Sequence, residues 1–389
     1  MKIVMLSSLS YSLINFRGAL LRSLVEQGNE VVACAPDFDP VIVSALDRMG
    51  IRFRLTPMAR AGTNPFRDIE TLAHYLRLLR QERPDAVIAY TQKPIIYGGL
   101  AMRLLRLRGF HALMSGLGYV YSPEADHRWL LRRFVSRLYR AGVARAAAIF
   151  VFNGDDRRMM MDNGIIGYDH HVIQIGGSGI DTAHFSECPL PRTPPVFLMI
   201  ARLMRDKGVP EFVEAARIVK AHHPQARFQL LGRMETETPT GCKKDELAEW
   251  VASGLIEHLP ETRDVRPDLA KAHVFVLPSF YREGLPRTLL EALAMGRPVI
   301  TTDTPGCREP VEPGVNGWLV RPRDSQALAN AMLDALQDRA RLVQMASNAR
   351  RTAVERYDVE KVNAQVVECL HLSARLPRAG VRQALSGTR

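Results

Sequence analysis

The densest group of residues that could perform chemistry reads PSFYREGLPRTLLEA and spans 278–292. It follows an apolar run typical of a strand, and its second proline is typical of the first turn of a helix. Glu283 would then lie in the loop and Glu291 about two turns inside the helix. The backbone N–H groups of Gly284 and Leu285, with the helix dipole behind them, could hold an anion. The pattern suits a sugar diphosphate, although a capping carboxylate and an exposed helical glutamate would explain either acid taken alone.

A second group reads IARLMRDKG, spans 200–208 and also follows an apolar run. Arg202 and Lys207 would lie in a loop at the carboxyl end of that strand. Two such cations can clamp a diphosphate, arginine through its planar fork and lysine as a point charge. They could neutralise a leaving group without a metal ion. Solvated surface charge is the alternative for this segment considered alone.

The elements that must position these residues alternate along the chain, as in an α/β fold. The strands are nearly continuous apolar runs, which indicates parallel sheets covered by helices on both faces. In the first half we predict strands at 3–6, 30–34, 52–55, 86–90, 112–115 and 148–152, and helices at 18–26, 69–81, 95–107 and 128–145. In the second half we predict strands at 196–200, 227–231, 256–259, 273–277 and 298–301, and helices at 209–221, 243–252, 286–294, 326–336, 339–355 and 359–373.

A glycine-rich and proline-rich break around 176–195 separates the two halves. It predicts two Rossmann-like domains in tandem, 1–185 and 186–358, which would face each other across a cleft. The helix at 359–375 would cross back to the first domain, and 376–389 would form a frayed tail.

Together the two groups resemble the retaining glycosyltransferases of family 4, which have the GT-B fold. The resemblance rests on Arg202, on Lys207 followed by Gly208, and on Glu283 and Glu291 eight positions apart. It extends over the whole chain. The segments 7–18, 64–66, 115–118 and 179–181 resemble one branch, which builds bacterial surface glycans on undecaprenyl diphosphate. That branch includes the N-acetylgalactosaminyltransferase that extends a diacetylbacillosamine-linked lipid in N-glycan assembly.

The resemblance implies a role for each residue of the site. Arg202 and Lys207 would hold the donor diphosphate, Glu283 would bind hydroxyls of the donor sugar, and Glu291 would accept hydrogen bonds from the ribose. The configuration at the anomeric carbon would be retained, with a donor phosphate oxygen taking the proton of the acceptor. The donor would be UDP-GalNAc or a close relative, and no cofactor or metal would be required. The expected donor-binding residues are Gly18, Arg202, Lys207, Glu283, Gly284, Leu285, Thr288, Leu289 and Glu291.

Two stretches of the first half depart from the family pattern. Many members have a glycine pair after the first strand, whereas this chain has only Gly18 there. Many also have a histidine where this chain has a glycine-rich stretch at 115–119, so we name no catalytic histidine. The acceptor, a sugar on a lipid diphosphate, would bind on this side. The expected acceptor-side residues are Gly116, Gly118, Tyr119 and Lys93.

The predicted helix at 128–145 is basic and amphipathic. Leu131, Phe134, Val135 and Leu138 would share one face. The arginines expected at an anionic membrane surface are Arg128, Arg132, Arg133, Arg137 and Arg140. Each cation near such a surface contributes about 1 kcal/mol to the free energy of membrane binding. Equally, the apolar face could pack against the protein core while the arginines face water.

Composition limits the class of protein. The 389 residues are 47% hydrophobic and 24% charged, with a net charge of +11 and no run of about 18 apolar residues. We expect a peripheral protein on the cytoplasmic face of the inner membrane.

The five cysteines have no paired spacing that suits zinc or disulfides, and the signatures of nucleic-acid modules are missing. Asp37 and Asp39 would be loop acids that cap the next helix rather than a metal site.

Three other functions are alternatives to a transferase. A sugar-nucleotide epimerase of the same fold would act without an acceptor. An NAD-dependent oxidoreductase would need glycines directly after the first strand, where the sequence reads SSLSYS. A binding protein derived from a transferase would not need the intact cations and acids. Within the transferases, UDP-GlcNAc, UDP-galactose and GDP-mannose remain alternative donors.

Overall fold

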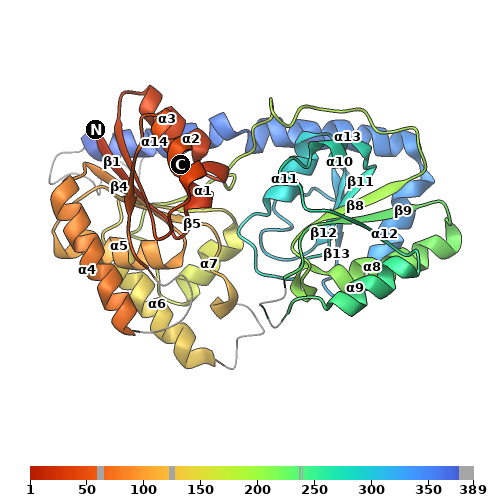
Figure 1. Ribbon diagram of the computed structural model, residues 1–389, viewed down its shortest axis with the longest axis horizontal. Coiled ribbons are helices and arrows are strands. Elements are labelled where there is room, and N and C mark those ends of the chain that lie inside the picture. Colours follow the sequence, from red (N-terminus) through yellow and green to blue (C-terminus); the bar gives the residue numbers. More distant parts are fainter. Residues whose placement is uncertain (59–64, 122–127, 236–237, 239, 376–389) are drawn as a thin grey trace. The chain divides into compact units, whose positions relative to one another are not determined.

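The computed structural model describes residues 1–58, 65–121, 128–235, 238 and 240–375 (Figure 1). The chain forms two compact units, one made of Met1–Ser178 with Glu360–Arg389 and the other of Gly179–Val359. The second unit begins earlier than the predicted 186 because Ile180 already pairs with the end of that unit. Its N–H donates to the carbonyl oxygen of Tyr357 at 2.8 Å. Asn64 and the predicted tail at 376–389 lie outside the described residues.

The first unit, unit 1, is built on a seven-stranded parallel sheet with the order β3-β2-β1-β4-β5-β6-β7. The central strands are buried along their whole length because helices cover both faces. The strands are β1 Lys2–Leu6, β2 Glu30–Ala35, β3 Arg52–Leu55, β4 Ala86–Tyr90, β5 Phe110–Met114, β6 Ala148–Val151 and β7 Val172–Gln174.

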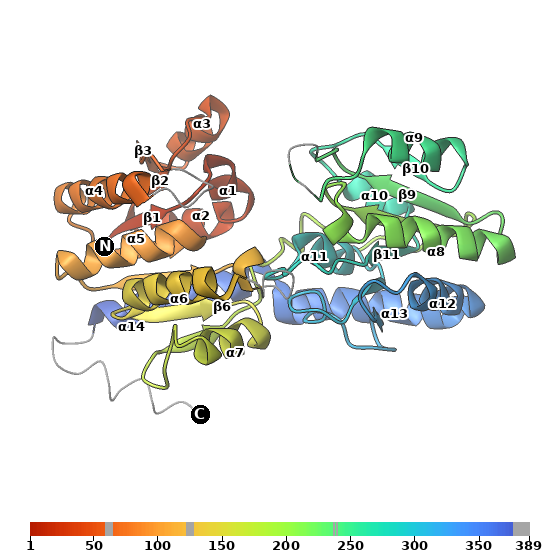
Figure 2. The same cartoon turned by 90° about the horizontal axis from the view of Figure 1, so that it is seen from below.

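Except for the last helix, α14, the helices of unit 1 lie in the connections between its strands, and those that directly follow a strand begin near the carboxyl edge of the sheet. Helix α5 packs against both α4 and α6, and the three lie side by side in both views (Figures 1 and 2). The helices are α1 Ser10–Asn15, α2 Gly18–Glu26, α3 Pro40–Arg48, α4 Pro65–Glu82, α5 Gln92–Leu104, α6 Trp129–Val143, α7 Gly154–Asp162 and the last helix, α14 Val359–Arg375.

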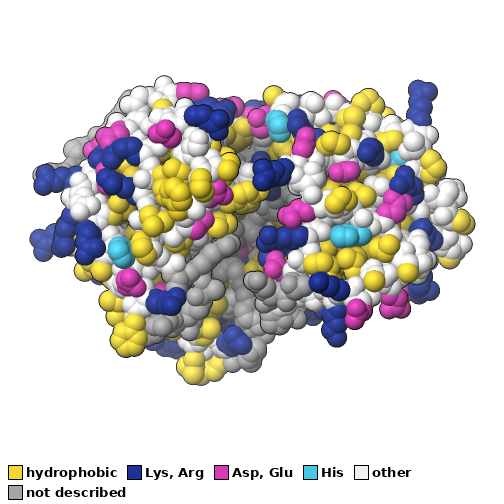
Figure 3. All heavy atoms as spheres, viewed as in Figure 1, with side chains coloured by type: hydrophobic (Ala, Val, Ile, Leu, Met, Phe, Trp, Pro, Cys, Tyr) yellow, Lys and Arg dark blue, Asp and Glu magenta, His cyan; other side chains and the backbone are white. Residues whose placement is uncertain are grey.

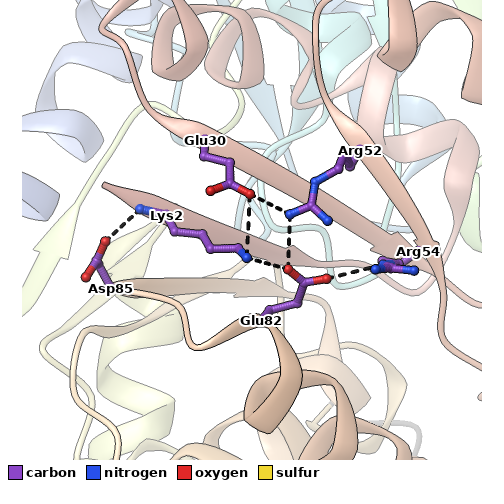
Figure 4. Close-up of polar contacts among 6 residues, drawn as sticks. All are labelled: Lys2, Glu30, Arg52, Arg54, Glu82 and Asp85. Atoms are coloured by element: carbon purple, nitrogen blue, oxygen red, sulfur yellow. Dashed lines mark hydrogen bonds and ion pairs between the residues drawn. The ribbon is translucent and has the colours of Figure 1, made fainter.

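An ion cluster closes the opposite, amino edge of the unit 1 sheet (Figure 4). The side chain of Glu82, at the end of α4, is buried and accepts from the Nζ atom of Lys2 at 2.6 Å. It also pairs with Arg52 at 3.1 Å and Arg54 at 3.2 Å. Burial alone would raise the pKa of Glu82, but hydrogen bonds from Lys2 and Arg52 outweigh it and hold that pKa below its ordinary value.

The second unit, unit 2, has a six-stranded parallel sheet with the order β10-β9-β8-β11-β12-β13. Its strands are β8 Val196–Ile200, β9 Arg227–Leu231, β10 Glu257–Leu259, β11 Val274–Leu277, β12 Val299–Thr302 and β13 Gly317–Val320. Its helices are α8 Val209–His222, α9 Lys244–Ala252, α10 Arg266–Lys271, α11 Arg287–Ala294, α12 Ser325–Gln337 and α13 Arg339–Thr352, which continues as a π-helical turn, Ala353–Tyr357. Two Rossmann-like α/β units were predicted, and the structure confirms them.

The sequence prediction missed the short and the weakly patterned elements. Edge strands β7 and β13, and helices α1, α7 and α10, were not predicted, and α3 was expected only as the helix that follows Asp39, without bounds. Strand β7 has three residues, none of them buried, so it lacks the apolar run that marks the central strands. Helix α5 begins at Gln92 rather than at the predicted Ile95 because its first turn is polar and gives no apolar periodicity.

Candidate active site

The loops that follow β8 and β11 are held together at the carboxyl edge of the unit 2 sheet. These two strands are parallel neighbours. The loop after β8 forms a 3-10 turn, Arg205–Lys207, and the carbonyl oxygen of Asp206 within it accepts from the N–H groups of Phe280 and Tyr281, both at 2.9 Å. The hydroxyl of Ser279 donates to the same oxygen at 3.3 Å. Two segments that are far apart in the sequence are thereby fixed in register.

Gly208 permits this close approach. Its φ angle is +78°, and a Cβ atom added there would lie 2.2 Å from the carbonyl oxygen of Pro278. Any side chain would therefore push the two loops apart. The glycine that follows Lys207 in the sequence pattern is a packing requirement of the site.

Lys207 and Glu283 form an ion pair across these loops. Their side chains are only 14% and 15% exposed, and the hydroxyl oxygen of Ser279 lies 3.4 Å from Oε1 of Glu283. The Nζ atom of Lys207 lies 5.2 Å from the centre of the Tyr281 ring, within the range of a cation–π contact. The sequence predicted a separate partner for each charge, phosphate for Lys207 and sugar for Glu283. In the structure these two charges also contact each other.

Arg202 lies at the same edge of the sheet but is paired elsewhere. Its Nη1 atom is 3.1 Å from Oε2 of Glu235, in the loop after β9, and its side chain is about half exposed. Sequence reasoning had not singled out Glu235, which has no motif around it. The structure thus brings Lys207 and Glu283 into contact and places Arg202 in a second ion pair.

Helix α11 begins at Arg287, directly after the Glu283 loop, so the positive end of its dipole lies behind that loop. Glu291 is one turn inside the helix, not the predicted two, because the helix starts later than expected. Nε of Arg287 lies 3.1 Å from Oε1 of Glu291. Burial raises the pKa of Glu291 to about 7, although Arg287 opposes the shift.

The other predicted donor residues of unit 2 surround this helix start. Gly284 is buried, and Leu285 and Thr288 are half-buried. The side chain of Leu289 belongs to the hydrophobic core, and its N–H donates to the carbonyl oxygen of Pro286 at 3.2 Å. Leu289 therefore supports the loop from within.

In unit 1 the predicted Gly18 is the first residue of α2 and is buried. A Cβ atom there would meet only Ile14, at 4.0 Å, so no contact within the described protein demands a glycine. The preceding residue, Arg17, was given no role from the sequence. Its guanidinium is buried, 5.2 Å from the Tyr90 ring centre and 5.6 Å from that of Phe152. A cation at the carboxyl ends of β4 and β6 is a further candidate for contact with an anionic group.

The predicted acceptor-side residues lie at this same edge of unit 1. Lys93, in the first turn of α5, pairs with Asp68 of α4 at 2.7 Å. Gly116 and Gly118 have φ angles of +115° and +72° in the loop after β5. Tyr119 opens a 3-10 turn, Tyr119–Tyr121, but its side chain is outside the part that the structure describes.

The basic helix exists as α6. On its apolar face Val135 is buried, whereas the Phe134 side chain is 57% exposed. Phe134 lies where the apolar face meets the outward face, so the helical period alone could not assign it. Arg128, Arg133, Arg137 and Arg140 are exposed and Arg132 is half-buried. No described helix is long and apolar enough to cross a membrane.

The two acids after β2 have structural partners. Asp39 caps α3 by accepting from the N–H groups of Val41 and Ile42. Asp37 accepts from the N–H group of Ser10 at 2.9 Å and from its hydroxyl at 2.5 Å. Among the described residues, no group of three or more His, Cys, Asp or Glu side chains could hold a metal ion.

Two family models match separate parts of the chain. The model "Glycosyl transferase 4-like domain" matches residues 16–176, and "Glycosyl transferases group 1" matches residues 194–338. The chain belongs to the family 4 glycosyltransferases. It is therefore an enzyme that transfers a sugar, as the family resemblance implied.

Curated relatives and solved structures agree with this assignment. The N,N'-diacetylbacillosaminyl-diphospho-undecaprenol alpha-1,3-N-acetylgalactosaminyltransferase of Campylobacter jejuni is 26% identical over 94% of this chain and 96% of its own length. The UDP-Gal:alpha-D-GlcNAc-diphosphoundecaprenol alpha-1,3-galactosyltransferase of Escherichia coli is 22% identical over 80% and 81%. HepE of Anabaena in complex with UDP has the same fold, with a TM-score of 0.77, 20% identity, and coverage of 96% of this chain and 100% of HepE.

Proposed function

We propose that this glycosyltransferase moves a hexosamine, GalNAc or a close relative, from a UDP-sugar to a sugar carried on undecaprenyl diphosphate. The product would serve surface-glycan or glycoprotein-glycan assembly. The observation that carries the proposal is the Lys207–Glu283 pair, held at the carboxyl edge of the unit 2 sheet in front of α11. The two curated relatives named above, whose names specify undecaprenol-linked acceptors, support the acceptor class.

In this proposal the cations of unit 2 bind the diphosphate of the donor, and its two acids bind the sugar and the ribose. The diphosphate meets Lys207, Arg202 and the start of α11, which together stabilise the negative charge of the departing UDP. Glu283, released in part from Lys207, accepts hydrogen bonds from sugar hydroxyls, and Glu291 accepts from the ribose. Because these cations supply the compensating charge, we expect transfer to persist in excess EDTA.

Retention of configuration is part of the proposal. The bond between the anomeric carbon and the phosphate oxygen breaks, and the acceptor hydroxyl attacks on the same face. Its proton passes to a phosphate oxygen of the leaving UDP. Lys207 and Arg202 stabilise that diphosphate before and after the proton moves.

On the acceptor side, Lys93 and the glycines at 116 and 118 would border the lipid diphosphate and its sugar. The exposed arginines of α6 would face anionic lipid on the cytoplasmic surface of the inner membrane, where the protein would be peripheral. Reversing the charge of Arg133, Arg137 and Arg140 should abolish binding to anionic liposomes. Unchanged binding would remove this role from the helix.

The deciding experiment offers the purified enzyme a panel of sugar nucleotides with a lipid-diphosphate sugar as acceptor. Transfer from UDP-GalNAc or UDP-GlcNAc, with an α-linked product seen by NMR, is the expected result. UDP-galactose is the second candidate donor, favoured by the galactosyltransferase relative. A β-linked product would disprove retention, and free sugar nucleotide altered without an acceptor would disprove transfer.

A further inference from the structure

Exposed apolar side chains gather at the starts of two helices of unit 1. Phe66 and Ile69 lie in the first turns of α4, and Trp129 and Leu130 open α6, with Phe134 one turn further on. Each of the five is more than half exposed. We call these five residues the apolar rim.

The topology of the sheet puts both parts of the rim at one edge. Helix α4 follows β3 and α6 follows β5, and both strands belong to one parallel sheet. Both helices therefore begin at the carboxyl edge. Helix α5 packs between them and carries Lys93 in its first turn. The rim thus flanks the edge at which the acceptor is proposed to bind.

Cations alternate with the apolar side chains on the outward face of α6. Arg133 and Arg137 are exposed and lie on the same helical face as Leu130 and Phe134, whereas Val135 is buried. Figure 3 shows apolar and basic side chains interspersed along the lower part of unit 1, where Figure 1 places the starts of α4 and α6. Single exposed apolar residues are common on proteins, but a group of them beside cations marks an interaction surface.

The residue types favour one kind of partner. Tryptophan and phenylalanine side chains with neighbouring arginines suit the headgroup region of a bilayer, where rings enter the acyl boundary and cations meet anionic headgroups. We propose that the apolar rim inserts into an anionic bilayer and turns the carboxyl edge of the unit 1 sheet toward it. This inference rests on the proposed function for its acceptor and adds insertion to the electrostatic contact described above.

A vesicle assay with a matched control tests the insertion. Leu130 and Leu104 are 64% and 61% exposed and lie on neighbouring helices, but Leu104 ends α5 at the opposite edge of the sheet. Affinity for vesicles of phosphatidylethanolamine and phosphatidylglycerol should fall by about tenfold or more in Leu130→Ser/Phe134→Ser. Leu104→Ser should stay within about twofold of wild type, and an equal loss in both variants would overturn the proposal.

Fluorescence gives a second measurement that needs no destabilising change. Brominated lipids should quench the wild-type protein more strongly than Trp129→Phe, because the other tryptophans, Trp250 and Trp318, are half-buried in unit 2. Equal quenching of the two proteins would show that Trp129 does not enter the bilayer.

Activity on a short-chain, water-soluble acceptor separates this inference from the proposed function. The Leu130→Ser/Phe134→Ser enzyme should keep wild-type turnover on that acceptor and lose turnover on vesicle-borne acceptor. A wild-type enzyme that is active but does not bind vesicles would refute the inference alone. A wild-type dimer that the same substitutions convert to a monomer would assign the rim to a second copy of the chain instead.

Discussion

The ammonium group of Lys207 is paired with the carboxylate of Glu283, although 76 positions separate the two residues in the sequence. Each belongs to a loop that follows a strand of unit 2, and the carbonyl oxygen of Asp206 joins the loops. A donor diphosphate that binds Lys207 must share it with this carboxylate. The pair therefore links phosphate binding to the position of the acid proposed to contact the sugar.

Removing either member of this pair should slow transfer strongly. In Lys207→Met the diphosphate loses its nearest cation, and in Glu283→Gln the sugar loses a charged acceptor. For each variant we expect the activation free energy of transfer to rise by about 2–4 kcal/mol, which lowers kcat/KM roughly 30- to 1000-fold. Initial rates with the donor identified in the panel would measure it. Lys244→Met, on the exposed surface of α9, is the control and should retain wild-type rates.

Gly208→Ala should damage both stability and activity. The new methyl group would meet the carbonyl oxygen of Pro278 and separate the two loops that hold Lys207 and Glu283. We expect a loss of about 2–4 kcal/mol in the free energy of unfolding, together with reduced kcat/KM.

Gly254→Ala is the matched control for this change. Gly254 has a φ angle of +69°, close to that of Gly208, but its added Cβ atom would have no neighbour within 4 Å. That variant should lose only about 1 kcal/mol, the cost of the backbone conformation, and keep its activity. Equal losses in the two variants would show that the loop contact is unimportant.

The sequence predicted the elements that carry strong apolar patterns. The buried central strands, such as 86–90, were found because each is a continuous apolar run, and 112–115 was found with a small shift. The motif around Glu283 was placed correctly between a strand and a helix because strand, loop and proline each leave a local signal. Edge strand β7 has no such signal, since its residues are not buried.

The pairing of charges could not be predicted from the sequence. Arg202 contacts Glu235 and Lys93 contacts Asp68 because separate segments converge in space. No periodicity encodes that convergence, and a motif names the residues without naming their partners. The exposure of Phe134 could not be predicted for a related reason, since it lies at the border of the apolar face of α6 and its burial depends on neighbours outside that helix.

Glu82→Gln should destabilise unit 1. The substitution leaves Lys2, Arg52 and Arg54 around a neutral side chain, with Glu30 still paired with the side chains of Lys2 and Arg52 (Figure 4). The arginines are about half exposed, which limits the loss to about 2–4 kcal/mol in the free energy of unfolding. Since the pKa of Glu82 is lowered in the folded state, its contribution is present above the ordinary glutamate pKa and disappears as pH falls through the lowered value.

Urea unfolding at pH 7 and at decreasing pH measures this contribution. Glu70→Gln is the control, since Glu70 lies on the same helix with a largely exposed side chain and a 3.8 Å contact to His74. It should change the free energy of unfolding by less than about 0.5 kcal/mol. A Glu82→Gln protein as stable as Glu70→Gln would show that the cluster contributes nothing.

Glu291 should make the stability of unit 2 fall as pH rises. Burial raises its pKa from an ordinary 4.5 to about 7, so between these values the folded state binds a proton that the unfolded state has released. Ionisation in the folded state then costs free energy, up to about 3 kcal/mol once pH exceeds 7. Glu291→Gln cannot ionise, so the unfolding free energy of wild type minus that of the variant should fall by about 2.5 kcal/mol from pH 5 to pH 8.

Unfolding of both proteins across that range tests the effect, with Glu249→Gln on the exposed face of α9 as a control that should follow wild type. A pH-independent difference between wild type and Glu291→Gln would contradict the raised pKa. Saturating UDP provides a further test, because ribose hydroxyls that donate to Glu291 would favour its ionised form. The difference in unfolding free energy between wild type and Glu291→Gln should then change at a lower pH than it does without UDP. If UDP leaves that pH unchanged while still binding, the ribose contact must be made by other groups.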